Sequence, residues 1–169
     1  MPEPLTPVIV WQDKRQEQLL GTVERELVLE RSRLPLDPYF SAGKLAWLLA
    51  HDEQVQRAAE RGTLRMGTVD AFLVDRLGRR FATDLSSASR TQLLAFQGRD
   101  WDERLLSAFG VERRWLPALG PTFGALGELR HERWPLALPA RPTRPCSARR
   151  CSRASVRACS RASITRHSI

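Results

Sequence analysis

A proline-stiffened loop and the start of a helix lie together in Leu34-Pro-Leu-Asp-Pro-Tyr-Phe-Ser-Ala-Gly-Lys-Leu45. Each proline fixes its own φ and biases the residue before it toward extended geometry, so the first half of this run cannot be the interior of a helix. Ser41 provides an N-cap, and residues 42–51 place three leucines on one face of a helix. The run therefore predicts a rigid loop that holds Tyr39 and Phe40, followed directly by a helix.

Two elements are predicted before this loop. The short apolar run Pro7-Val-Ile-Val-Trp11 follows prolines and is typical of a buried strand, which would open the visible domain. Residues 14–29 are rich in Gln, Glu, Leu and Arg, as in a surface helix. Gly21 is the weak point of that helix, because glycine costs backbone entropy in a helix interior.

Two further helices are predicted after the loop. Residues 54–61 form a short helix that stops at Gly62. Thr68 can cap a second helix over residues 69–77. The apolar residues of this second helix recur at helical spacing and form one stripe: Val69, Phe72, Leu73 and Leu77.

Short strands and a last helix complete the predicted body. Strand candidates cover Arg80–Thr83 and Gln92–Phe96, on either side of a polar turn at Asp84–Ser89. The pattern Asp100-x-x-Glu103 resembles a capping box and starts a helix that ends at the next glycine. We therefore predict a mixed α/β fold that is helix-rich and has few, short strands.

The net charge of +8 belongs to one end of the chain. The 169 residues include 27 Lys and Arg against 19 Asp and Glu. Residues 1–134 hold 19 basic and 19 acidic side chains, whereas residues 135–169 hold eight arginines, no acid and all three cysteines. The tail has too little apolar surface to offset the entropy of ordering, so residues 135–169 are predicted to be a disordered tail rich in Arg, Ser, Ala, Pro and Cys.

Composition argues against several classes of protein. No apolar run reaches the ~18 residues that a membrane span needs, so no membrane partner is expected. No secretory signal is visible at the N-terminus, and the cysteine-free body fits a cytoplasmic location. The tail cysteines have no C-x-x-C spacing, so no metal site is predicted. Eight arginines without aromatic neighbours could bind nucleic acid only non-specifically.

Trp11 and Tyr39 are the candidate binding residues. Trp11 ends the predicted strand, where loops and ligands meet in α/β folds, and Tyr39 lies in the proline-stiffened loop. An apolar ring together with a phenol suits a polyol, whose carbons stack while its hydroxyls form hydrogen bonds. On spacing alone, the interpretation that both are core residues is favoured over a binding role.

Six strings follow one another along the body: Val8-Ile-Val-Trp-Gln-Asp-Lys-Arg15, Leu34-Pro-Leu-Asp-Pro-Tyr-Phe-Ser-Ala-Gly-Lys-Leu45, Gly67-Thr-Val-Asp-Ala-Phe-Leu-Val74, Ala82-Thr-Asp84, Ala88-Ser-Arg-Thr91 and Asp100-Trp-Asp102. Together they resemble the N-terminal domain of the FGGY carbohydrate kinases, with the glycerol kinases most similar. The resemblance implies an incomplete, actin-like (ribonuclease-H-like) α/β kinase domain over residues 5–134.

The same resemblance implies an activity and a site. It implies transfer of the γ-phosphoryl group of ATP, with Mg, to glycerol, giving glycerol 3-phosphate. In glycerol kinases the Trp of the Val-Trp-Gln string packs on the glycerol carbons, and the Tyr of Asp-Pro-Tyr-Phe-Ser hydrogen-bonds a hydroxyl. Carried over, these substrate-binding residues are Trp11 and Tyr39, which reverses the core interpretation. Lys44 and Trp47 resemble helix-packing positions, and family members are often homo-oligomers.

Parts of the family pattern are missing here. These are the phosphate hairpin and Arg-Glu pair that precede Val8 in the family, the Gly-Asp-Gln string with the catalytic Asp, and the ATP-binding second domain. We therefore assign no catalytic residue and no ligand of ATP or Mg, and expect this truncated chain to bind glycerol poorly and not to phosphorylate it.

The composition of the tail resembles the product of a GC-rich gene that is translated out of frame. The alternatives are a kinase for another polyol or sugar, and a non-enzymatic module that binds nucleic acid through its cationic tail.

Overall fold

The fold was determined as a computed structural model, which describes residues 3–123 and 126. These residues belong to one compact unit, Met1–Pro139. A second unit, Ala140–Ile169, lies outside the described residues, and so do the predicted boundary at residue 134 and the predicted tail.

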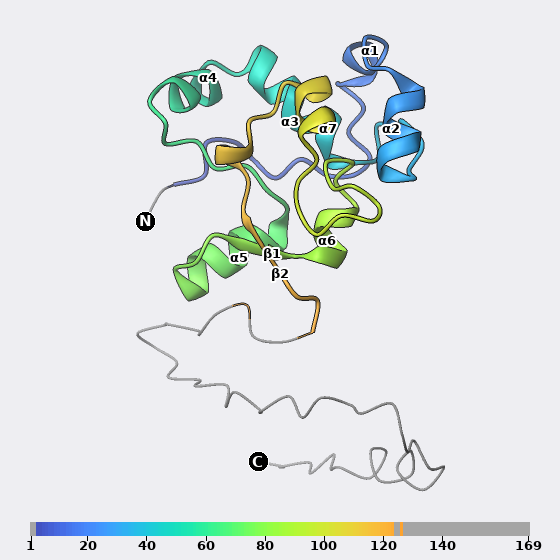
Figure 1. The fold of residues 1–169 in the computed structure, drawn as a ribbon. Helices are drawn as coiled ribbons and strands as arrows, with labels where there is room; N and C mark the ends of the chain where they lie inside the picture. The colour runs from blue at the N-terminus through green and yellow to red at the C-terminus, as the bar shows by residue number, and fades with distance from the viewer. Residues whose placement is uncertain (1–2, 124–125, 127–169) are drawn as a thin grey trace, which may run out of the picture. The chain divides into compact units, whose positions relative to one another are not determined.

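Helices make up most of the regular secondary structure of the described residues, which also include two short strands (Figure 1). The elements are, in chain order, α1 (Glu17–Leu20), α2 (Arg25–Ser32), α3 (Ser41–His51), α4 (Glu53–Glu60), α5 (Val69–Gly78), β1 (Ala82–Asp84), α6 (Leu85–Ser89), α7 (Glu103–Phe109), the 3-10 helix η1 (Arg113–Trp115) and β2 (Ala118–Gly120). The prediction of a helix-rich α/β body with few, short strands is confirmed.

The strand predicted over residues 7–11 is wrong. The segment forms no strand, and Val8, Val10 and Trp11 are exposed. An apolar run becomes a strand only when a neighbour completes its hydrogen-bond ladder. Within residues 3–123 the named strands pair with each other and not with this segment, which remains irregular.

The helix predicted over residues 14–29 is divided into α1 and α2. The chain leaves the helix at Gly21, where Thr22 caps the last turn by donating its hydroxyl hydrogen to the Leu19 carbonyl at 2.8 Å. The weak point was therefore placed correctly, and its effect is a complete break. α2 ends at Arg33, which adopts a left-handed conformation with φ of 59°.

The helices predicted after the loop are confirmed as α3, α4 and α5, but Ser41 is the first residue of α3 and not its N-cap, which is Phe40. α4 stops before Gly62, whose φ is +68°, as expected for a glycine that closes a helix. Thr68 precedes α5, but its hydroxyl donates to the carboxylate of Asp70 and caps no backbone group. The predicted apolar stripe of α5 is exposed, at Val69, Phe72, Leu73 and Leu77.

Strands β1 and β2 form a parallel pair in which Ala82 lies opposite Ala118. The predicted strand over Arg80–Thr83 is thus confirmed, displaced toward the C-terminus. The strand predicted over Gln92–Phe96 is wrong: Gln92 has a φ of 66°, which interrupts an extended run. The turn predicted over Asp84–Ser89 is instead the helix α6, which Asp84 caps by accepting from the Ser87 amide at 2.7 Å.

The helix predicted after Asp100 is α7, but its cap lies two residues later. Asp102 accepts hydrogen bonds from the backbone amides of Arg104 and Leu105 at 3.0 and 3.1 Å. Asp100 does not cap the helix, because its carboxylate pairs with the Arg113 guanidinium at 2.6 Å. Asp102 also accepts from Arg31 Nε at 2.9 Å, which ties α2 to the start of α7.

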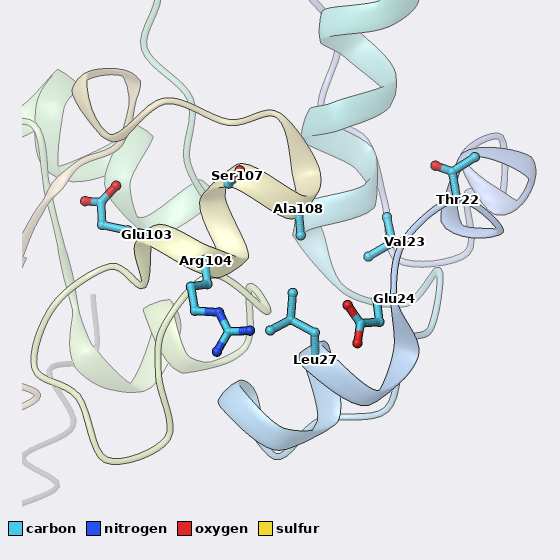
Figure 2. Close-up of a pocket in the computed structure, with 8 residues that line it drawn as sticks. All are labelled: Thr22, Val23, Glu24, Leu27, Glu103, Arg104, Ser107 and Ala108. Atoms are coloured by element: carbon cyan, nitrogen blue, oxygen red, sulfur yellow. The ribbon is translucent and has the colours of Figure 1, made fainter.

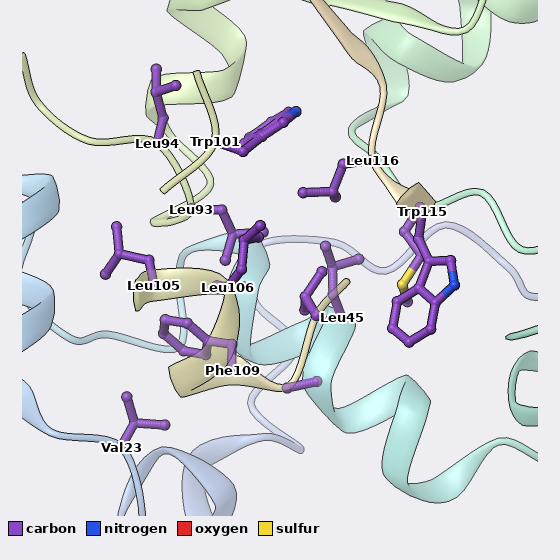
Figure 3. Close-up of a cluster of buried hydrophobic side chains, with 14 of the residues drawn as sticks. Val23, Leu45, Leu93, Leu94, Trp101, Leu105, Leu106, Phe109, Trp115 and Leu116 are labelled. Atoms are coloured by element: carbon purple, nitrogen blue, oxygen red, sulfur yellow. The ribbon is translucent and has the colours of Figure 1, made fainter. Parts of the chain in front are cut away.

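The core forms where α7 packs on α3 (Figure 3). Leu105 and Phe109 point from α7 into this cluster, and Leu45 enters it from α3. The ring of Trp101 packs in the same cluster, and its indole nitrogen donates a hydrogen bond to the Pro117 carbonyl at 2.9 Å. Within residues 3–123 and 126, no helix is long and apolar enough to span a membrane.

Candidate functional site

The structure brings the two predicted substrate-binding residues together. The ring centroids of Trp11 and Tyr39 lie 6.0 Å apart, with the planes tilted by 54°. Both side chains face solvent: Trp11 is 61% exposed and Tyr39 is 50% exposed. The expectation from spacing alone that they are core residues is therefore wrong.

Trp11 lies in a tight turn. The Asp13 amide donates to the Val10 carbonyl at 3.2 Å, so that residues 10–13 form a β-turn with Trp11 at its second position. We call these residues the Trp11 turn. The turn leads directly to Gln16 and α1.

Tyr39 lies in a loop that its own residues stiffen, as the prolines predict. The Tyr39 amide donates to Asp37 Oδ1 at 2.7 Å, and the Phe40 amide donates to the Asp37 carbonyl at 3.3 Å. Buried Phe40 meets the Tyr39 ring edge-on, with centroids 5.2 Å apart and planes at 87°. The guanidinium of Arg90 lies over Phe40 at 5.0 Å. We call residues 34–40 the Tyr39 loop.

The Pro38 carbonyl is the point where three segments meet. It accepts a hydrogen bond from Gln16 Nε2 at 2.7 Å and a second from the ammonium group of Lys44 on α3. Gln16 Nε2 also donates to the Asp13 carbonyl at 3.0 Å. Both donor side chains are buried. Burial lowers the pKa of Lys44, and the nearby carboxylates of Asp13 and Asp37 oppose that shift.

Charged groups surround the base of the Trp11 turn. Arg15 donates to Asp13 through its backbone amide and through its guanidinium, with the shortest contact at 2.7 Å. These bonds lower the pKa of Asp13 to about 2. The Arg15 guanidinium also lies 4.5 Å above the ring of Trp47, which stacks on His51 at 4.7 Å. The Asp13 carboxylate is thus engaged by Arg15, while the Asp13 backbone carbonyl accepts from Gln16.

The pair offers two kinds of contact at one place. The indole presents an apolar face, and the phenol can both donate and accept a hydrogen bond. Such a combination suits a small molecule with carbons on one side and hydroxyls on the other. In the described part of the chain, no group of three His, Cys, Asp or Glu side chains is placed to hold a metal ion.

A cleft lies away from this pair. A cleft of about 490 Å³ opens between the start of α2 and α7 (Figure 2). Leu27 and Ala108 line it with apolar surface, and Glu24, Arg104 and Ser107 line it with polar groups. Neither Trp11 nor Tyr39 borders this cleft, so it is separate from the predicted site.

Gln16 was not predicted as a site residue, and Lys44 was predicted only to pack its helix. Gln16 stands in a Gln- and Glu-rich stretch that reads as a solvated helix surface, so nothing in its neighbourhood indicates burial. The position of Lys44, one turn into a predicted helix, gave no indication that its ammonium reaches back to Pro38. Both contacts depend on how α3 packs, which a local pattern does not contain.

Comparison with known proteins places the chain in a protein family. Residues 1–137 match the FGGY family of carbohydrate kinases, N-terminal domain, and the chain belongs to this family. The relatives it matches include a glycerol kinase of Methylorubrum extorquens, 43% identical over 137 residues, and one of Leptothrix cholodnii, 44% identical over 131 residues. These alignments cover 76% and 74% of this chain, and 27% and 26% of the relatives.

Solved structures give the same fold. The chain is similar to Plasmodium falciparum glycerol kinase with ADP, with a TM-score of 0.72 and 26% identity over 78% of this chain. A xylulose kinase from Rhodospirillum rubrum matches with a TM-score of 0.65 at 21% identity over 80% of this chain. The predicted actin-like kinase fold is thereby confirmed. The chain spans about a quarter of the length of the curated relatives it matches.

Proposed function

We propose that this chain provides the polyol-binding surface of a glycerol kinase, with Trp11 packing on the glycerol carbons and Tyr39 hydrogen-bonding a hydroxyl. The observation that carries the proposal is the 6.0 Å approach of two exposed rings, at the turn and the loop whose strings resemble the glycerol kinases. The identities of 43% and 44% to glycerol kinases support glycerol as the substrate.

The reaction of the proposed complete enzyme moves the γ-phosphoryl group of ATP to a glycerol hydroxyl. This chain contributes binding and orientation: holding the polyol in one pose raises the effective concentration of the reacting hydroxyl. Among the described residues no group of three His, Cys, Asp or Glu side chains converges, and none of these residues is assigned as a ligand of Mg²⁺. No step through the metal or through ATP is therefore assigned to them.

The proposal is tested by glycerol titration of the full chain labelled with 5-fluorotryptophan. The Trp11 fluorine resonance, assigned by its loss in Trp11→Phe, should shift saturably, whereas the resonance of buried Trp101 should stay. Tyr39→Phe keeps the ring and removes one hydrogen bond, so it should raise the glycerol Kd about three- to tenfold. Phe96→Leu changes another exposed ring and should leave the Kd unchanged.

Other outcomes separate the alternatives. Equal, linear shifts of all tryptophan resonances would contradict the glycerol site. Saturation by xylulose and not by glycerol would favour another polyol or sugar. Glycerol-dependent ATP turnover by the purified chain would contradict the prediction that it is inactive alone.

The non-enzymatic alternative concerns the tail. Salt-titrated DNA binding that disappears when residues 135–169 are removed would favour a nucleic-acid-binding module. Oligomeric state and a cytoplasmic location stay predictions.

A further inference from the structure

Gln16 is the buried polar side chain that joins the two halves of the aromatic pair. Its side chain is 1% exposed, although the next two residues, Glu17 and Gln18, are exposed. Both hydrogens of its amide have an acceptor: the Asp13 carbonyl at 3.0 Å and the Pro38 carbonyl at 2.7 Å. Asp13 ends the Trp11 turn, and Pro38 directly precedes Tyr39.

The Gln16 side chain also packs closely against helix α3. Helix α3 passes so close that a Cβ added to Gly43 would lie 3.1 Å from Gln16 Cγ and 2.8 Å from Leu20 Cδ2. Such distances leave the Gln16 side chain little room to change rotamer. A fixed donor with two acceptors sets the distance between the segments that carry those acceptors.

We propose that Gln16 is a positioning residue of the polyol site, whose amide holds Trp11 and Tyr39 at the separation that binds a polyol. The role in polyol binding rests on the proposed function. Lys44 hydrogen-bonds the Tyr39 loop through Pro38 and interacts with Asp13 of the Trp11 turn only through charge, whereas Gln16 hydrogen-bonds both segments. Gln16 is thus the residue whose loss should uncouple the two rings while leaving each segment in place.

The test is a double substitution read by fluorine NMR of the full chain. Tyr39→Leu removes a ring 6.0 Å from Trp11 and should shift the Trp11 resonance in the wild-type background. In Gln16→Met, which keeps the side-chain length and removes both donors, that shift should largely disappear. In the matched control Gln18→Met, an exposed glutamine of α1, the shift should persist.

Glycerol binding provides the second readout. Gln16→Met should raise the glycerol Kd about tenfold or more, since the Asp13 carbonyl loses its Gln16 donor, the Pro38 carbonyl keeps only Lys44, and the ring separation is released. Gln18→Met should leave the Kd unchanged. If the wild-type chain shows no response to glycerol, the proposed function fails, and the ring-to-ring shift still decides whether Gln16 couples the pair.

Two results would overturn the positioning role. One is a Gln16→Met chain that is less stable to urea yet keeps the full effect of Tyr39→Leu on Trp11, which would make Gln16 a structural residue only. If Gln16→Met does not fold, as judged by loss of the dispersed Trp101 resonance, the second test is made on the wild-type chain. Side-chain amide hydrogens of Gln16 that exchange as fast as those of Gln18 would show that the two bonds are absent, and slow exchange would support them.

Discussion

The Tyr39 loop and the Trp11 turn face each other but are built differently. The Tyr39 loop has two proline-restricted positions, an Asp37 side chain that accepts from the Tyr39 amide, and the buried ring of Phe40 beneath it. The Trp11 turn has one backbone hydrogen bond, and apolar residues on its N-terminal side are exposed. The conformation of the Tyr39 loop is set largely by its own residues, whereas the position of the Trp11 turn depends on contacts with neighbouring residues such as Gln16.

The largest expected difference in the free energy of unfolding is between two truncations, one on the helix that follows the Tyr39 loop and one in the Trp11 turn. Leu45, which is 9% exposed, lies on the helix that follows the Tyr39 loop. Leu45→Ala should lower the free energy of unfolding by about 2–5 kcal/mol, because it removes packing in the core. Val10→Ala, at a site that is 54% exposed, should cost less than about 0.5 kcal/mol. Urea unfolding followed by circular dichroism measures both, and equal losses would show that the Trp11 turn is packed as firmly as the core.

An intermediate effect is expected from the Asp37 turn. Asp37→Ala leaves the Tyr39 amide without its acceptor and should lower the free energy of unfolding by about 0.5–1.5 kcal/mol. Asp37→Asn keeps an oxygen at the same place and should restore most of the loss. Urea midpoints and hydrogen exchange at the Tyr39 amide report the change. An Asn variant as weak as the Ala variant would assign the effect to charge and not to the turn.

The smallest effect is a pH dependence of the Trp11 turn. The Arg15 hydrogen bonds lower the pKa of Asp13 from 3.8 to about 2, so the folded chain binds this proton more weakly than the unfolded chain. The stabilisation is present above about pH 4 and is lost as the pH falls toward 2. The difference in stability between wild type and Asp13→Asn should therefore shrink over this range. A difference that stays constant down to pH 2 would contradict the shift. The effect is small because the Arg15 partner is exposed and solvent screens the pair.

The contrast between the two halves also explains what the sequence could predict. Prolines act on their own residue and its neighbour, so the loop around Tyr39 could be predicted from local sequence alone. The break at Gly21 and the left-handed end of α7 at Gly110 are equally local. The prediction of a strand over residues 7–11 was wrong because a strand needs a neighbouring strand, which its own sequence does not supply.

The site shows the same division. The approach of Trp11 to Tyr39 could be expected only from the family resemblance, because residue spacing favoured two core side chains. The two bonds that converge on the Pro38 carbonyl were not predicted: Gln16 reaches it only when α1 has packed on α3, and Lys44 reaches back to it from the first turn of α3. The cap at Asp102 was missed by two residues because Asp100 fits the same pattern, and its pairing with Arg113 is a tertiary contact.

The exposed apolar stripe of helix α5 affects how the chain behaves in solution. Ala71 is buried and Asp70 accepts hydrogen bonds from the Thr68 and Thr83 hydroxyls, which fixes one side of the helix. The apolar stripe on its other side meets water along the helix. Such a surface favours reversible self-association and the uptake of hydrophobic dyes. The colloidal behaviour of a concentrated sample should therefore respond to polar substitutions on this helix while the fold around Tyr39 is unaffected.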